Sequence, residues 1–400
     1  MRAKRFLHSF PMKLWIILAA IVAITFFSND FGLVDIQKTA IILAAGIDRT
    51  ADGFSLTAQI AVPKGSDRTT GGTSSVEIEG QGATVSDCIS AIYAMTGWVP
   101  KLVFCDLVLL GEEAARANAF DALDFFLRNE YAPDSCLLAV CEGTAAETLK
   151  ATSAIDDASS LALEKLFSDA AKKSGRVMTT TLREFAIGYY GRSESGYMPY
   201  VRMIDQNGAQ GGSGSSGNTG GSGGQSAAGG QSAAGGQSGQ EMIFSAEQTA
   251  VFSQGRMTDV LTEAETFAFS LLKGNVYGGT LPSDGITLAV LRNDGSVSLA
   301  EEPTLQATLS VDLKVRLAGR DAPSSPENVA KDSVTEEELS AAESALRGAI
   351  GSLWERCAQS ECDLFNLRRT LYRRSAAAYG TWKPLSQIGT EIRVRIEGLR

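Results

Sequence analysis

The 400-residue sequence predicts an α+β fold: several mixed α/β subdomains, each a sheet with packed helices, behind a single N-terminal membrane-anchoring helix. Three observations predict this fold class. An uncharged apolar run, Leu14–Phe27, lies close to the N-terminus. Strand-like and helix-like patterns then alternate, which is typical of helices packed on a sheet. Finally, seven apolar residues recur at every second position from Leu305 to Leu317, the period of a half-buried strand.

The N-terminal segment predicts attachment to a membrane. Residues 1–13 contain four basic residues and no acid, so the positive-inside rule places this tail in the cytoplasm. Residues 14–30 are expected to be a signal anchor, although the apolar run is shorter than the ~20 residues of a straight transmembrane helix. A cleaved signal peptide is the alternative. Bulky Phe26 and Phe27 stand where cleavage needs small residues, which favours the anchor.

Residues 36–206 predict an N-terminal α/β ectodomain. Ala40–Ile47 and Phe54–Val62, separated by a polar turn, are typical of a β-hairpin. The almost wholly apolar Leu102–Leu110 indicates a central strand. The other expected elements are a strand near Val76–Glu79, a helix capped by Thr84 and Asp87, a helix over Phe120–Arg128, a strand over Cys136–Cys141, a helix capped by Thr144 and Glu147, one amphipathic helix near Ser159–Lys172 and a short helix over Arg183–Tyr190.

Residues 207–240 are rich in Gly, Ser, Gln and Ala and predict a flexible linker or a looped-out insertion. The sequence GGQSAA at 223–228 is repeated at 229–234. From Gly208 to Gly239 no apolar side chain is larger than alanine, so no burial offsets the entropy of ordering this stretch.

Residues 241–400 predict a C-terminal α/β domain. Its clearest element is the period-two strand that ends near Leu317, with polar residues on the opposite face. A long helix is expected after the capping pair Thr335 and Glu338. The other expected elements are strands over Thr249–Phe252, Ile286–Leu291 and Ile392–Ile396, and a helix from the capping pair Thr262 and Glu265 toward Leu272.

Charge and histidine content exclude several classes of function. The formal net charge is −10 despite the basic tail, which disfavours binding to nucleic acid. The single histidine, His8, lies in that tail, so the ectodomain lacks the usual general base and the Ser-His-Asp and Cys-His nucleophile systems. We therefore expect no enzyme activity, no cofactor, and no catalytic, cofactor-binding or metal-binding residues. A carboxylate-based extracytoplasmic hydrolase is the enzymatic alternative.

The six cysteines lack the spacing of a metal site. None forms a CxxC motif, and the two close pairs are five positions apart. We expect buried small side chains, while a disulfide between Cys105 and Cys136 stays open outside the membrane. The six are Cys88, Cys105, Cys136, Cys141, Cys357 and Cys362.

Four other groups have both a structural and a functional interpretation. Glu112 and Glu113 are expected to stabilise a helix N-terminus rather than perform acid–base chemistry, and Thr179–Thr181 to build a strand rather than bind a ligand. Four tyrosines fit core packing, a pocket or an interface, and four arginines fit a solvated helix face or a contact to an acidic subunit or lipid headgroups. These are Tyr189, Tyr190, Tyr197 and Tyr200, and Arg368, Arg369, Arg373 and Arg374.

The order of these patterns resembles one known family. The residues that carry the likeness in the first half are Ile41–Asp48 (IILAAGID), the hairpin ending at Pro63, Leu107–Glu113 (LVLLGEE), Leu123–Arg128 (LDFFLR), Thr180–Leu182 with Phe185, and Met198-Pro199. In the second half they are Thr249–Phe252, Gly255, Leu261–Thr266, the period-two strand, Asp363, Trp382-Lys383, Ile392 and Val394. Together they are similar to the Ger(x)C family, the C subunits of bacterial spore germinant receptors.

The resemblance implies a non-enzymatic membrane-anchored subunit of a nutrient germinant receptor complex, which acts in spore germination through subunit contacts. It implies A-type and B-type receptor membrane subunits as partners, a response to a small nutrient germinant, and a single-pass location in the spore inner membrane with the ectodomain outside. A small-ligand-binding sensor module is a further alternative. The family is usually lipid-anchored through a cysteine near the position of Asp30; since this chain has none there, its apolar segment is expected to replace the lipid. Leu364–Leu367 likewise replaces the glycine-and-aromatic turn expected after Asp363.

Overall fold

The computed structural model describes residues 15–22, 39–62, 74–153, 156, 158–205, 242–274, 276–301, 304–320, 334–374 and 376–399. Residues 15–22 form a helix, and no helix in the described ranges is both long and apolar enough to cross a bilayer. The tail 1–13, the remainder of 14–30, Pro63 and the stretch 207–240 lie outside the described residues.

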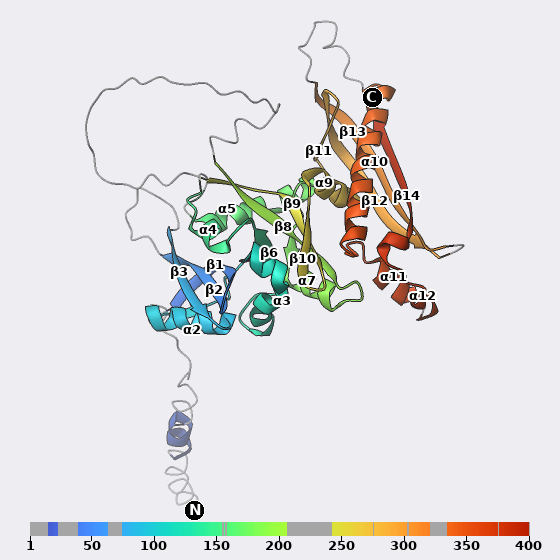
Figure 1. Ribbon diagram of the computed structural model, residues 1–400. Coiled ribbons are helices and arrows are strands. Elements are labelled where there is room, and N and C mark those ends of the chain that lie inside the picture. The colour runs from blue at the N-terminus through green and yellow to red at the C-terminus, as the bar shows by residue number, and fades with distance from the viewer. Residues whose placement is uncertain are drawn as a thin grey trace, which may run out of the picture.

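Within the described residues, ten strands form the larger of two sheets (Figure 1). They are β1 (Thr39–Thr50), β2 (Gly53–Val62), β3 (Ser74–Gly82), β4 (Val99–Lys101), β5 (Leu107–Gly111), β6 (Leu137–Cys141), β7 (Thr180–Thr181), β8 (Ser195–Asp205), β9 (Met242–Ser253) and β10 (Arg256–Leu261). The order is β10-β9-β8-β6-β5-β1-β2-β3, with β4 paired to β1 and β7 paired to β6. The expected hairpin is β1–β2, and β5 lies at the centre of the sheet.

Helices cover both faces of this sheet. One face packs against α2 (Val85–Thr96), α3 (Glu112–Arg128) and α7 (Leu182–Tyr190). The other face packs against α4 (Ala145–Lys150) and α5 (Ser159–Leu166), and α6 (Asp169–Ser174) follows. This layering of helices on a sheet confirms the predicted α+β class.

Two elements differ from the sequence prediction. The strand expected over Leu102–Leu110 begins only at Leu107, because residues 102–106 form a turn in which the Cys105 N–H donates to the Leu102 carbonyl at 2.9 Å. The single helix expected near Ser159–Lys172 is two helices. Ser168 separates α5 from α6, because its hydroxyl accepts the Ala171 N–H and so caps a new helix instead of continuing the old one.

The chain leaves and rejoins the larger sheet on either side of residues 207–240. β8 ends at Asp205, β9 begins at Met242, and these two residues are partners in an antiparallel ladder. β9 then pairs with β10 at the outer edge of the sheet. The larger sheet therefore continues past residue 241, and a domain boundary at that residue stays a prediction.

The second sheet carries the predicted period-two strand. Within the described residues it has the order β11-β12-β13-β14. In β13, Val311 and Val315 have no exposed surface, whereas the alternating Asp312 and Lys314 are exposed. The strands are β11 (Thr280–Ser283), β12 (Ile286–Ala300), β13 (Gln306–Arg320) and β14 (Gly389–Gly398).

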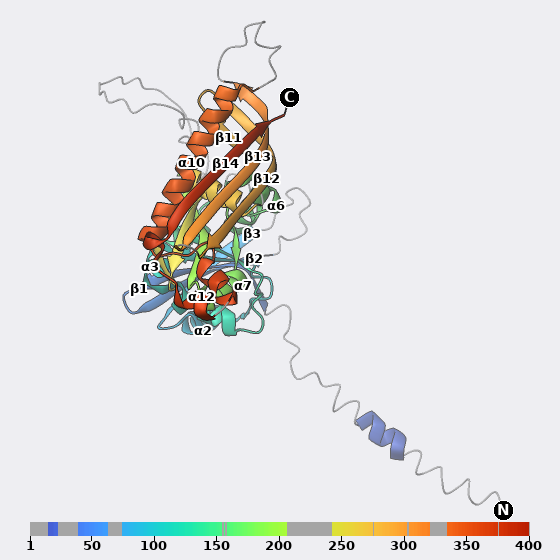
Figure 2. The ribbon, with the colours of Figure 1, turned by 90° about the vertical axis from the view of Figure 1, so that its right-hand side faces the viewer.

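Two helices bury the apolar face of the second sheet. They are α9 (Glu263–Leu272) and α10 (Glu336–Gln359), and both begin at the predicted capping boxes. Figure 1 labels both, and Figure 2 shows α10 lying along the sheet. β12 passes the end of α9 so closely that a Cβ at Gly295 would lie 1.8 Å from the Leu271 carbonyl oxygen. The chain then returns to β14 through α11 (Leu367–Arg374), α12 (Ala376–Gly380) and the 3₁₀ turn η2 (Leu385–Gln387).

Candidate functional site

All six cysteines are free and buried. Burial raises the pKa of each thiol, to about 12 for Cys136 and Cys362. The disulfide left open between Cys105 and Cys136 is not formed. Within the described part of the chain, no group of three His, Cys, Asp or Glu residues is arranged to hold a metal ion. The thiols therefore act as core side chains.

Asp48 and Gly111 meet where β1 and β5 end. The Asp48 carboxylate accepts the N–H groups of Ala145 at 2.8 Å and Ala146 at 2.9 Å, so it caps α4 from a distant strand. A Cβ at Gly111 would lie 2.0 Å from Asp48 Oδ1, which explains why a glycine fits there. Burial raises the pKa of Asp48, and the two backbone N–H groups oppose that change. Both residues serve the fold rather than a reaction.

Glu112 stands at the first position of α3, as the sequence predicts. Its carboxylate accepts hydrogen bonds from Arg116 at 2.7 Å and from the Tyr200 hydroxyl at 3.0 Å. Desolvation by burial raises the pKa of Glu112, but these hydrogen bonds, the charge of Arg116 and a backbone hydrogen bond together outweigh it, so the pKa is lowered. Glu113 is exposed on the next position of the helix. The structure does not bring these two carboxylates together as an acid–base pair.

The four tyrosines do not line one common pocket. Tyr189 stacks on Phe120 with ring centroids 3.7 Å apart, and Tyr190 beside it is exposed. Tyr197 makes an edge contact with Phe269 at 5.1 Å. Tyr200 is buried and donates to Glu112. The threonine segment likewise has a structural role, since the Thr181 hydroxyl caps α7 by accepting the Glu184 N–H.

A cleft of about 180 Å³ lies between α7, β8, the end of α9 and residues 363–369. A second cavity of about 230 Å³ shares Glu184, Tyr197 and Lys273 with it. The Lys273 ammonium lies 5.4 Å from the ring centroids of Tyr197 and Phe269 and forms no ion pair among the described residues. Lys273 is exposed as a whole residue, yet desolvation of its ammonium in the cleft lowers its pKa.

Carboxylates also line this cleft, but as helix caps. Both oxygens of Asp363 accept backbone N–H groups, from Leu367 at 2.8 Å and Arg368 at 2.9 Å. One oxygen of Glu184 accepts the Thr181 N–H at 3.0 Å. Burial raises the pKa of Asp363, and these backbone bonds oppose the change. The cleft therefore offers an ammonium to a small anion, while Asp363 has its oxygens committed to the fold.

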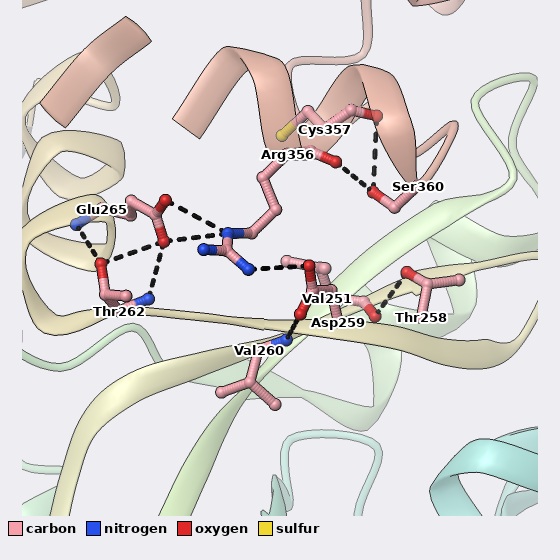
Figure 3. Close-up of polar contacts among 9 residues, drawn as sticks. All are labelled: Val251, Thr258, Asp259, Val260, Thr262, Glu265, Arg356, Cys357 and Ser360. Atoms are coloured by element: carbon pink, nitrogen blue, oxygen red, sulfur yellow. Dashed lines mark hydrogen bonds and ion pairs between the residues drawn. The ribbon is translucent and has the colours of Figure 1, made fainter. Parts of the chain in front are cut away.

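Arg356 lies on α10, which packs on the second sheet, and its side chain connects this helix to the larger sheet (Figure 3). Its Nε donates to the Glu265 carboxylate at 3.1 Å, and a terminal nitrogen donates to Asp259 on β10 at 2.9 Å. Glu265 is only 4% exposed, and it also accepts the backbone N–H and hydroxyl of Thr262 in the capping box of α9. We call Arg356, Asp259 and Glu265 the junction triad.

The sequence did not reveal the junction triad. The capping box at Thr262 was visible, but a glutamate in such a box normally faces solvent. Only the packing of α10 beside α9 and β10 brings Arg356 to this carboxylate. The one available signal was an arginine, Arg356, directly before Cys357, one of the cysteines that the sequence predicts to be buried.

Comparison with known families was decisive for both halves of the chain. Residues 33–203 match the family model described as the spore germination protein N-terminal domain. Residues 247–398 match the model described as the spore germination B3/GerAC-like C-terminal domain. The chain belongs to the Ger(x)C family. In this Ger(x)C chain the first matched region ends within β8 and the second begins within β9, so the two family domains share one sheet through a pair of strands.

One solved structure is similar to this Ger(x)C chain. It is described as the crystal structure of the GerBC protein, with 14% sequence identity, a TM-score of 0.47, and coverage of 89% of this chain and 97% of that one. A search among curated proteins gave no significant match.

Proposed function

We propose that this Ger(x)C chain is a non-enzymatic, membrane-anchored subunit of a nutrient germinant receptor, which acts in spore germination through contacts with A-type and B-type membrane subunits. The observation that carries the proposal is the match of both family domains, in order, over most of the chain. The local chemistry agrees with it, since the buried thiols, Asp48 and Asp363 are all committed to packing or to helix caps.

Spores test the proposal directly. Deletion of the gene should abolish or slow the fall in optical density that a particular nutrient triggers, while spore yield stays normal. Complementation with the full chain should restore the response. Normal germination of the deletion strain with every nutrient tested would contradict the assigned role. Co-purification of the A-type and B-type subunits with the tagged chain would test the subunit contacts separately.

The membrane attachment is proposed from the apolar run and its basic flank. The ectodomain would lie on the extracytoplasmic side of the spore inner membrane, behind a single pass. Aspartate at both Ile17 and Ile21 should move the chain from the membrane to the soluble fraction, because charges are costly in a bilayer. Aspartate at the exposed Tyr277 and Leu399 is the matched control and should leave it membrane-bound. The mass of the mature N-terminus distinguishes an anchor from a cleaved signal peptide.

The Lys273 cleft favours a second candidate function, a small-ligand-binding sensor module. An ammonium that forms no ion pair within the described part of the chain, and that lies close to two aromatic rings, suits a small carboxylate. Small carboxylates should then raise the melting temperature of the chain, whereas the corresponding amides should not. Lys273→Gln should remove the difference. Equal effects of acid and amide would count against this function.

A further inference from the structure

Several strands of the larger sheet start at the same edge. β4 and β5 run parallel to β1, β6 runs parallel to β5, and β8 runs parallel to β6. The segments that lead into these strands therefore gather on one side. We call this side the entry edge; it consists of residues 95–98, 102–106, 129–136 and 187–194, together with the first residues of β1.

Contacts join these segments to the end of β4 and to α11. The Lys101 ammonium lies 5.6 Å from the centroid of the Tyr131 ring. The Arg192 guanidinium lies 4.5 Å from the ring of Tyr372 on α11 and 5.9 Å from that of Tyr379 on α12. Figures 1 and 2 both show α2, α7 and α12 at the lower end of the folded part. The entry edge and the basic helix α11 thus belong to one side of the molecule.

The entry edge exposes large hydrophobic side chains. Val103 and Phe104, adjacent in the turn before β5, are 52% and 54% exposed. Most of the other large hydrophobic side chains that are exposed outside residues 15–22 lie here too. They are Ile41, Met95, Trp98, Tyr131, Ile187 and Tyr190, and the exposed Tyr372 lies beside the edge on α11. A gathering of this kind on a soluble surface marks an interaction site.

Positive and negative side chains are unevenly distributed between α11 and the loops of the entry edge. α11 contains four arginines and no acid, and Arg369 and Arg373 form no ion pair among the described residues. The loops carry the exposed acids Asp106, Glu130 and Asp134 and the half-buried acid Glu194. The loops can therefore attract a partner only through their apolar side chains, whereas α11 supplies the attraction to anions.

The length of the chain before β1 identifies the membrane as the partner of the entry edge. If residues 14–30 are held in the bilayer, only residues 31–38 separate them from Thr39, the first residue of β1. Eight residues span at most about 28 Å when fully extended. The start of β1 lies on the entry edge, so this edge, and no other part of the ectodomain, is obliged to stay close to the membrane surface.

We propose that the entry edge rests on the surface of an anionic bilayer, with Val103 and Phe104 at the level of the headgroups and α11 facing lipid phosphates. Aromatic and aliphatic side chains suit this depth, and clustered arginines near it attract anionic lipid. This inference rests on the proposed anchor. It adds that the ectodomain has a fixed orientation on the membrane instead of swinging on its tether.

The test uses the full chain in vesicles of phosphatidylcholine and phosphatidylglycerol in equal parts. Phe104→Cys carries a nitroxide label, and Tyr277→Cys, 66% exposed in the loop before β11, is the matched control. The native thiols are buried with raised pKa values, so the unsubstituted chain should take up little label. Relaxation of the label by oxygen, which enters lipid, is compared with relaxation by a water-soluble nickel chelate.

Oxygen should relax the label at residue 104 more strongly than the nickel chelate does. At residue 277 the chelate should be the stronger relaxing agent. Vesicle flotation separates the two claims. A chain that does not float with the vesicles refutes the anchor. A chain that floats, with residue 104 as open to the chelate as residue 277, overturns the entry-edge proposal and leaves the anchor standing; it would point to a protein subunit as the occupant instead.

A second pair of variants tests the role of α11. The label at residue 104 should become more accessible to the nickel chelate when phosphatidylglycerol is omitted. The double substitution Arg369→Gln and Arg373→Gln should remove this dependence of the label's shielding on lipid charge. Arg347→Gln, exposed on α10, is the control and should retain it. Shielding that is independent of lipid charge in the unsubstituted chain would refute the contribution of α11.

Discussion

Replacing Arg356 by methionine should destabilise the junction between the two sheets. Methionine keeps the length of the side chain but leaves Glu265, 4% exposed, without its cation. Removing one partner of a fully buried ion pair costs about 3–5 kcal/mol, and an exposed pair contributes about 0–1 kcal/mol. The Arg356 side chain is 31% exposed and that of Glu265 only 5%, so an intermediate loss of about 2 kcal/mol is expected.

Urea denaturation followed by far-UV circular dichroism and by tryptophan fluorescence, to which Trp354 buried on the same helix contributes, measures this loss. With an m value near 2 kcal/mol/M, the midpoint should fall by about 1 M. Arg347→Met, an exposed position of α10, is the control and should change little. In a Glu265→Gln background, Arg356→Met should cost less than it does alone. Equal midpoints for Arg356→Met and Arg347→Met would refute the reasoning.

Three further outcomes follow from the structure. The six thiols should react with a thiol reagent near pH 8 only after unfolding, and the mass of the native chain should not change on reduction; rapid native labelling would contradict their burial. Gly295→Ala should cost about 1–3 kcal/mol, measured by urea denaturation, because its Cβ would meet the Leu271 carbonyl; an unchanged midpoint would show that β12 can move away. Hydrogen bonds from Arg320 and from Thr335 lower the pKa of Glu338 from 4.5 to about 2. Since the folded-state pKa is depressed, this stabilisation is complete above pH 4.5 and is lost as the pH falls toward 2. Glu338→Gln should therefore show a smaller loss of stability over that interval, and an identical loss would contradict the assignment.

Local signals in the sequence predicted most of the helices and strands. The threonine-to-acid spacings at Thr84, Thr262 and Thr335 each start a helix, because a capping box depends only on residues three positions apart. The period-two run of β13 was equally explicit, since alternate burial leaves a direct mark on the residue pattern. The helix expected near Ser159–Lys172 failed because its apolar spacing outweighed one local signal, the cap at Ser168.

Long-range arrangements could not be predicted in the same way. Nothing in β9 indicates that it pairs with β8 across 36 intervening residues, because strand pairing is decided by tertiary contacts and not by the strand's own pattern. The junction triad has the same origin. Asp259, Glu265 and Arg356 are unremarkable surface-type residues in sequence, and only the packing of α9 and α10 makes them neighbours.

The pairing of Asp205 with Met242 also changes what residues 206–241 mean for the molecule. Asp205 and Met242, which flank these residues, are held side by side, so the number of residues between them does not set any distance between the sheets. Closing a loop grows costly only with the logarithm of its length, and each doubling costs about 0.6 kcal/mol. A reporter domain inserted there would leave both sheets in place, and a protease cut there would yield two fragments that remain associated as one folded particle.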